Sequence, residues 1–97
     1  MTQQIPLHIP HDHPAFAGHF PGLPITPGVV LLDEAIHAIA RHARLDLQSY
    51  KINSVKFLKP VGPGAGLTVE YEMRANGNVH FDVKENQHTM ATGVFSA

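Results

Sequence analysis

The chain has 97 residues, of which 43% are hydrophobic and only 15% are charged, and its formal net charge is −1. One domain of this size has a small core, so a chain this apolar is expected to bury further surface as a homodimer or higher homo-oligomer. The balanced charge argues against a nucleic-acid-binding protein. The sequence has no cysteine, which excludes disulfide bonds and thiolate chemistry. No apolar run is long enough to span a membrane.

The chain begins without the charged start and apolar run of a signal peptide, so a cytoplasmic location is expected. Ile5 to Ile9 alternates in the manner of a short strand, and its prolines restrict it to the edge of a sheet. Residues 11–28 are rich in proline, glycine and histidine, which excludes a helix and disfavours a regular strand. A connection of this length is usually functional or disordered, and its apolar anchors favour an ordered loop. These anchors are Phe16, Phe20, Leu23 and Ile25.

Residues 29–43 have the spacing of an amphipathic helix, and Pro27 and Gly28 end the segment before it. The polar side of this helix carries Asp33, Glu34, His37 and Arg41. The first turn, Val29 to Leu32, is apolar all round, which predicts that it is buried on every side. Asp33 is therefore expected in apolar surroundings, which favour the neutral, proton-donating form of a carboxyl group.

The remainder of the chain predicts four strands in an antiparallel meander, at about 50–58, 67–74, 79–83 and 88–95. Asn76-Gly77-Asn78 is a strong hairpin signal between the second and third of these strands. Asn86-Gln87 is expected to turn the chain into the last one. One helix on one face of such a sheet is an α+β architecture.

The segment from Gly18 to Asp33 holds the parts of an acid–base site. His19 lies among prolines and glycines, where its ring can be held close to a ligand, and an imidazole with a pKa of about 6.5 moves protons at neutral pH. The first amides of a helix have no internal partner, so the Gly28 N–H can stabilise a carbonyl oxygen that gains negative charge. With Asp33 as the acid, these groups could remove a proton next to a carbonyl and expel a β-hydroxyl.

Several segments resemble the 3-hydroxyacyl-acyl-carrier-protein dehydratases of fatty acid synthesis. The likeness spans roughly Ile5 to Phe95 and is densest from Asp12 to Ala35. It is carried by Asp12-His13-Pro14-Ala15-Phe16-Ala17-Gly18-His19-Phe20-Pro21-Gly22, Pro24 to Val29, Leu31 to Ala35, Val55 to Val61, and Pro63-Gly64. The resemblance implies a single hotdog domain over residues 1–97, with an antiparallel sheet of about five strands wrapped around one central helix.

The resemblance also assigns roles to individual residues. His19 matches the catalytic histidine and Asp33 its acidic partner, and in this family the two come from different subunits of a hotdog dimer. Gly28 matches the glycine whose amide polarises the thioester carbonyl. The resemblance further implies that Phe20 and Pro27 bind the substrate and that the Ile25 carbonyl orients the His19 ring.

The implied reaction is dehydration of a (3R)-hydroxyacyl thioester to the trans-2-enoyl thioester, in fatty acid or polyketide- and aryl-polyene-type biosynthesis. The implied partner is an acyl carrier protein bearing the substrate on phosphopantetheine, with neither metal nor cofactor. The subunits would form a homodimer or higher homo-oligomer, or a hetero-oligomer with another hotdog subunit.

Three departures from the family pattern stand out. His37 occupies the position of a glutamine, and as the residue four after Asp33 it is either an orienting partner of that carboxylate or a solvated residue. Glu34 replaces a small residue and is a second carboxylate beside Asp33. Family members also carry an additional helix and hairpin at the N-terminus, which help to wall the acyl tunnel.

Two other functions remain open. A hotdog thioesterase would use a carboxylate to activate water, and a non-catalytic hotdog subunit would instead support an active dehydratase. A metal cluster of His8, His11, Asp12 and His13 is disfavoured, because no further ligand set follows at a recognised spacing. Lys56, Lys59, Arg41 and Arg44 form either a modest basic patch for an acidic carrier protein or a solvated surface.

Overall fold

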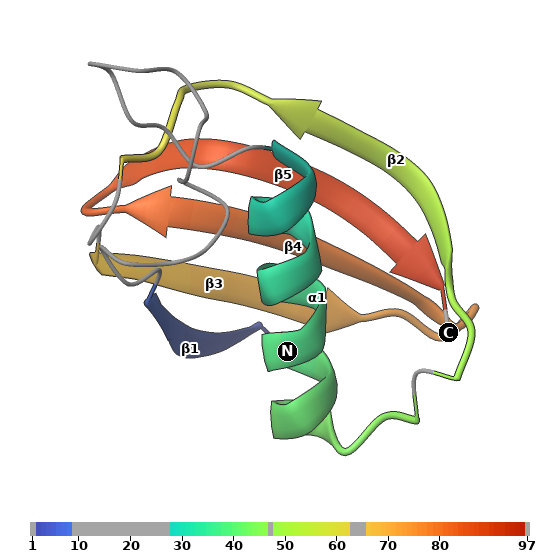
Figure 1. Ribbon diagram of the computed structural model, residues 1–97. Helices are drawn as coiled ribbons and strands as arrows, with labels where there is room; N and C mark the ends of the chain where they lie inside the picture. Colours follow the sequence, from blue (N-terminus) through green and yellow to red (C-terminus); the bar gives the residue numbers. More distant parts are fainter. Residues whose placement is uncertain (1, 9–27, 47, 63–65, 97) are drawn as a thin grey trace.

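The structure of the protein, a computed structural model, describes residues 2–8, 28–46, 48–62 and 66–96. Within these residues, one helix packs against a five-stranded antiparallel sheet (Figure 1). In chain order the elements are β1 (Gln3–His8), α1 (Gly28–Ala43), β2 (Lys51–Phe57), β3 (Gly66–Met73), β4 (Asn78–Glu85) and β5 (His88–Ser96). The predicted helix and the five predicted strands are therefore confirmed, with small shifts at their ends.

The order of strands in the sheet is β1-β3-β4-β5-β2, which corrects the predicted meander of four strands. β3, β4 and β5 do follow one another as a meander, but β2 pairs with β5 and not with β3. The free side of β3 is taken by β1. At the end of β2, the Leu58 and Lys59 amides donate hydrogen bonds to the Met90 carbonyl at 2.8 and 3.2 Å, which keeps the chain beside β5.

Two turns of the meander form where their residues predicted them. Gly77 has a φ of +88°, a conformation that glycine adopts without strain, and its amide donates to the Arg74 carbonyl at 3.0 Å. The Asn76 side chain accepts from the Asn78 amide at 3.0 Å, which closes the β3–β4 turn. Asn86, with a φ of +57°, serves the same purpose between β4 and β5.

Alternation along the inner strands places one set of side chains against α1. β3 and β4 each bury every second residue, and β1 does so over its apolar part. The core cluster is built from Ile5, Leu7, Leu31, Leu32, Ala35, Ile36, Ala38, Ile39, Val61, Leu67, Val69, Tyr71, Val79, Phe81, Val83, Met90, Ala91 and Phe95. The sheet curves around the helix that this core holds, which is the hotdog architecture expected from the sequence (Figure 1).

The first turn of α1 is not buried on every side within the single chain, which corrects a second prediction. Leu31 and Leu32 are buried, but Gly28 and Val30 are only half-buried. The Asp33 side chain is 56% exposed, so residues 28–46, 48–62 and 66–96 do not give its carboxyl group the apolar surroundings that were expected.

Candidate active site

The start of α1 supplies a hydrogen-bond donor beside an apolar cavity. Gly28 is the first residue of the helix, where amide groups have no partner within the helix. A cavity of about 310 Å³ opens next to it. Its lining consists of Gly28, Leu31, Phe57, Leu58, Lys59, Pro60 and Val61. A carbonyl group entering this cavity would meet the positive end of the helix dipole.

Asp33 and His37 form a pair on the outer side of α1. The His37 Nδ1 atom lies 2.7 Å from the Asp33 carbonyl oxygen and 3.2 Å from the Asp33 Oδ1 atom. Both side chains are about half-exposed, at 56% for Asp33 and 46% for His37. The structure thus brings His37 to Asp33, which is one of the two possibilities that its position four residues later left open.

This pair lies on the side of α1 that is nearest to β2. The His37 ring stands edge-on to the ring of Tyr50, with centroids 6.4 Å apart, and Tyr50 directly precedes β2. On the opposite side of the helix, the His42 Nδ1 atom lies 2.5 Å from the Tyr71 hydroxyl on β3. The Asp33–His37 pair therefore lies toward the β2 edge of the sheet, and not toward the β1 edge.

The Glu34 side chain leaves the helix in a different direction from that of Asp33, because successive residues of an α-helix point about 100° apart. It is half-buried, whereas Asp33 is exposed. The geometry thus distinguishes the two neighbouring carboxylates: Asp33 shares a side with His37 and Tyr50.

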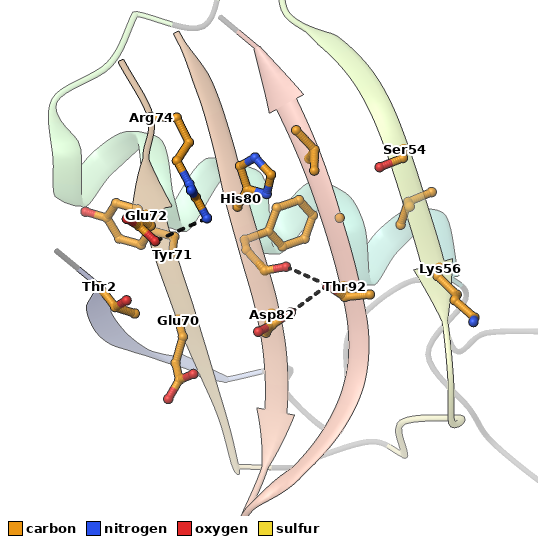
Figure 2. A pocket seen from close by; sticks show the side chains of 14 residues that line it. Thr2, Ser54, Lys56, Glu70, Tyr71, Glu72, Arg74, His80, Asp82 and Thr92 are labelled. Atoms are coloured by element: carbon orange, nitrogen blue, oxygen red, sulfur yellow. Dashed lines mark hydrogen bonds and ion pairs between the residues drawn. The ribbon is translucent and has the colours of Figure 1, made fainter. Parts of the chain in front are cut away.

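A larger cavity lies elsewhere, on the face of the sheet turned away from α1. It holds about 560 Å³ and is lined by both polar and apolar residues, most of them from β2, β3, β4 and β5 (Figure 2). Its acidic groups are engaged with neighbours: the Thr92 hydroxyl donates to Asp82 at 2.6 Å, and Arg74 lies 3.5 Å from Glu72. A hydrogen bond from Lys84 holds the pKa of Glu70 below its usual value.

This cavity therefore has the character of a sheet surface whose acidic side chains each have a hydrogen-bond or ion-pair partner. Lys56 lines it (Figure 2), whereas Arg41 belongs to α1 and Arg44 directly follows that helix. The basic residues considered as a carrier-protein patch are thus divided between two surfaces.

Several predicted site residues lie outside the described part of the chain. These are His19, Phe20, Ile25 and Pro27, together with His11, Asp12 and His13. That His19 of one subunit faces Asp33 of another therefore stays a prediction. His8 is exposed at the end of β1.

The structure adds Tyr50 and Phe57, which no sequence pattern distinguished from ordinary strand residues. Phe57 lies against Gly28, and Tyr50 lies against His37. Both contacts join β2 or its start to α1, and local alternation carries no information about such distant neighbours.

Two further features concern the described residues alone. Among residues 2–8, 28–46, 48–62 and 66–96, no three histidine or acidic side chains are grouped so that they could hold a metal ion. In the same ranges, α1 lacks the length and apolar character that a membrane-crossing helix needs.

Comparison with known proteins gives consistent matches. A family model described as ApeI-like, ApeI dehydratase, matches residues 1–94. The 3-hydroxyacyl-acyl-carrier-protein dehydratase FabZ of Methylobacterium sp. strain 4-46 is 40% identical over 73 residues, which are 65% of this chain and 43% of that protein. The chain spans about half the length of the curated relatives that it matches.

Solved structures resemble the fold over almost the whole chain. The dehydratase heterocomplex ApeI:P from Xenorhabdus doucetiae has a TM-score of 0.78 at 26% identity, covering 98% of this chain and 85% of that one. The fluoroacetyl-CoA thioesterase FlK has a TM-score of 0.71 at 12% identity, covering 98% of this chain and 82% of that one. That second likeness concerns the fold alone. Because the family model covers residues 1–94 of 97, the chain belongs to the ApeI-like dehydratase family.

Proposed function

We propose that the chain dehydrates a 3-hydroxyacyl thioester to the trans-2-enoyl thioester, with the substrate carried by the phosphopantetheine of an acyl carrier protein. The observation that carries the proposal is the placement of Asp33. In a chain of the ApeI-like dehydratase family, this carboxylate lies on the exposed side of α1, toward the β2 edge of the sheet. The FabZ relatives, whose names give the same reaction class, add support.

The proposed chemistry divides among three groups. His19 accepts the proton from C2 of the substrate, and the electron pair left behind moves toward the thioester carbonyl. The Gly28 amide stabilises the negative charge on that carbonyl oxygen. Asp33 donates a proton to the C3 hydroxyl, which leaves as water while the C2–C3 double bond forms. Phe20 and Pro27 would line the substrate path, and the Ile25 carbonyl would orient the His19 ring.

We further propose that the site is completed by a second hotdog subunit that pairs along β2. This strand is an edge of the sheet, and every one of its residues is exposed. Ile52, Val55 and Phe57 on β2 are 41%, 36% and 47% exposed, and Leu58 just beyond it is 46% exposed. An exposed apolar edge strand pairs readily with another chain.

Pairing along β2 accounts for the exposure of Asp33. A subunit added at this edge would lie on the same side as Asp33 and His37 and would cover them. It would then provide the apolar surroundings that suit a proton-donating carboxyl group, and it would bring the partner's own loop residues to the pair. The second subunit is either another copy or a different hotdog chain, and the second possibility is supported by the similarity to a dehydratase heterocomplex, ApeI:P.

Turnover of a 3-hydroxyacyl thioester on acyl carrier protein tests the function, with formation of the conjugated enoyl thioester as the measurement. His19→Ala is expected to abolish it, and Asp33→Asn to lower it by about 10²–10⁴-fold, the usual contribution of a positioned acid or base. Glu34→Gln is the matched control and should have a mild effect. Undiminished activity in His19→Ala would rule out this assignment, and the reverse order of the two acidic variants would transfer the role to Glu34.

The two other functions give different results in the same assay. A thioesterase would release free thiol from an acyl thioester without forming the enoyl product. A non-catalytic subunit would show turnover only when mixed with a co-encoded hotdog partner, and His19→Ala would then leave the turnover of the mixture unchanged.

A further inference from the structure

Tyr50 connects the core of the protein to the Asp33–His37 pair. Its ring meets the ring of Phe95 edge-on, with centroids 6.2 Å apart and an interplanar angle of 73°. Phe95 is fully buried, so this contact fixes one side of the tyrosine. The other side meets the His37 ring at 6.4 Å and 89°. Such edge-to-face contacts are favourable beyond the area that they bury.

The carbonyl oxygen of Asp33 holds the His37 ring in one tautomer. The Nδ1 atom lies 2.7 Å from the Asp33 carbonyl oxygen, and a carbonyl oxygen can only accept a hydrogen bond. Nδ1 must therefore carry a hydrogen, which fixes the Nδ1–H tautomer in the neutral ring. The same N–H is 3.2 Å from the Asp33 Oδ1 atom, so the orientation of the ring and that of the carboxylate are linked.

Burial does not hold this pair, because both side chains are about half-exposed. Exposed pairs of charged side chains contribute little by themselves, since holding the two groups in one geometry costs conformational entropy. The contact with Tyr50 supplies the missing restraint, and Tyr50 is in turn anchored on Phe95.

We propose that Tyr50 is a positioning residue for Asp33. It holds the His37 ring, the ring keeps its Nδ1–H on the Asp33 backbone and side chain, and the carboxylate thereby keeps its direction toward the proposed dehydratase site. The effect on turnover rests on the proposed function, whereas the effect on the His37 tautomer does not. Tyr50 acts through its ring, so its hydroxyl is not required.

The first test measures the tautomer of His37 directly. Nitrogen NMR of the imidazole in the full chain, at a pH where the ring is neutral, separates the Nδ1–H form from the Nε2–H form. His37→Gln assigns the signal, and thermal unfolding verifies that each variant is folded. Wild type and Tyr50→Phe are expected to show the Nδ1–H form alone, and Tyr50→Leu a mixture that includes the Nε2–H form. A pure Nδ1–H form in folded Tyr50→Leu would overturn the proposal.

The second test measures steady-state kinetics. Tyr50→Leu should lower kcat between about tenfold and a hundredfold, as small displacements of a catalytic group do, with KM unchanged. Tyr50→Phe keeps the ring and should restore most of the rate. In an Asp33→Asn background the Tyr50→Leu change should add no further loss, because both act through the same carboxylate.

The outcomes separate the two proposals. A full additional loss in the double variant would mean that Tyr50 does not act through Asp33. If Asp33→Asn itself left turnover unchanged, the proposed function would fail, and the tautomer measurement would still decide whether Tyr50 holds His37.

Discussion

The ring of Phe57 lies directly over Gly28, so closely that a Cβ atom placed on Gly28 would meet the ring at 3.0 Å. Contacts this short between a Cβ atom and a neighbour are rare, so one of the two groups would have to move. The first helix amide and the apolar cavity beside it thus depend on the absence of a side chain at residue 28.

Gly28→Ala is therefore expected to displace the Phe57 ring and to lower kcat by about tenfold or more, because the Gly28 amide, the proposed oxyanion donor, would lose its alignment. Folding should be retained, since alanine favours a helix more than glycine does. Steady-state kinetics together with thermal unfolding measure both effects.

The matched control is Phe57→Leu, alone and combined with Gly28→Ala. Leucine leaves room for the added methyl group, so the double variant should recover part of the activity that Gly28→Ala loses. Full activity in Gly28→Ala alone would mean that the ring moves aside without consequence.

A second glycine, Gly93, is expected to affect the stability of the fold and not the candidate active site. Gly93 on β5 is buried, and a Cβ atom there would lie 2.8 Å from the Phe81 ring and 2.9 Å from the Ser54 carbonyl oxygen. The carbonyl belongs to the backbone of β2 and cannot simply rotate away. Gly93→Ala is therefore expected to lower the free energy of unfolding by about 1–3 kcal/mol, the usual cost of overpacking.

Urea denaturation measures this loss, and Gly66→Ala is its control. Gly66 is exposed at the start of β3, and a Cβ atom there would meet nothing within 4 Å. That variant should be as stable as wild type or slightly more so, because alanine restricts the unfolded chain. Equal stability of the two variants would show that the sheet adjusts at Gly93.

Much of this fold could be predicted from local patterns. The alternation of β3 and β4, the Asn76-Gly77 turn and the helical spacing after Gly28 each depend on neighbouring residues, and each prediction was confirmed. The pairing of β2 with β5 could not be predicted in this way. Alternation of polar and apolar residues indicates which face of the sheet each side chain is on, but it does not indicate which strand lies next to which.

The site was predicted less completely, for a related reason. Helical spacing left open whether His37 pairs with Asp33 or is solvated, and the structure shows the pair. The contact of Tyr50 with His37 joins residues 13 positions apart that occupy different elements, and no periodicity marks it. The exposure of Asp33 escaped prediction because an apolar helix start does not reveal which surface covers it.

Tyr71 gives a prediction about pH. Burial raises the pKa of its phenol above the usual value of 10.0, and the hydroxyl lies 2.5 Å from His42 Nδ1. The unfolded chain releases this proton first as the pH rises past 10.0, so the unfolded state is stabilised relative to the folded state. The contribution of Tyr71 to stability is therefore fully present below that pH and is lost as the pH rises through the folded pKa.

Tyr71→Phe removes both the hydrogen bond and this titration. At neutral pH it should lower the free energy of unfolding by about 1 kcal/mol, the net value of a typical hydrogen bond. Above pH 10.0 the decline in stability should be smaller than in wild type. Denaturation curves recorded from neutral to alkaline pH measure both, and identical alkaline declines in the two proteins would contradict the assignment.

The last prediction concerns the edge strand β2. If a second subunit pairs along it, a charge in the middle of the strand should prevent the pairing. Val55 is 36% exposed there, between Lys51 and Lys59, and the segment from 51 to 59 carries three lysines and no acidic residue. Val55→Lys adds a fourth cation and removes an apolar contact, so it should convert the dimer to monomers in light scattering.

Met73→Lys is the matched control, because Met73 is also apolar and is 51% exposed, but it lies at the end of β3 away from the β2 edge. It should leave the dimer intact. Val55→Lys should also lose dehydratase turnover, because Asp33 would then lack the partner that covers it. A Val55→Lys protein that stays dimeric would place the subunit contact elsewhere, whereas a monomer with full turnover would show that one subunit holds the complete site.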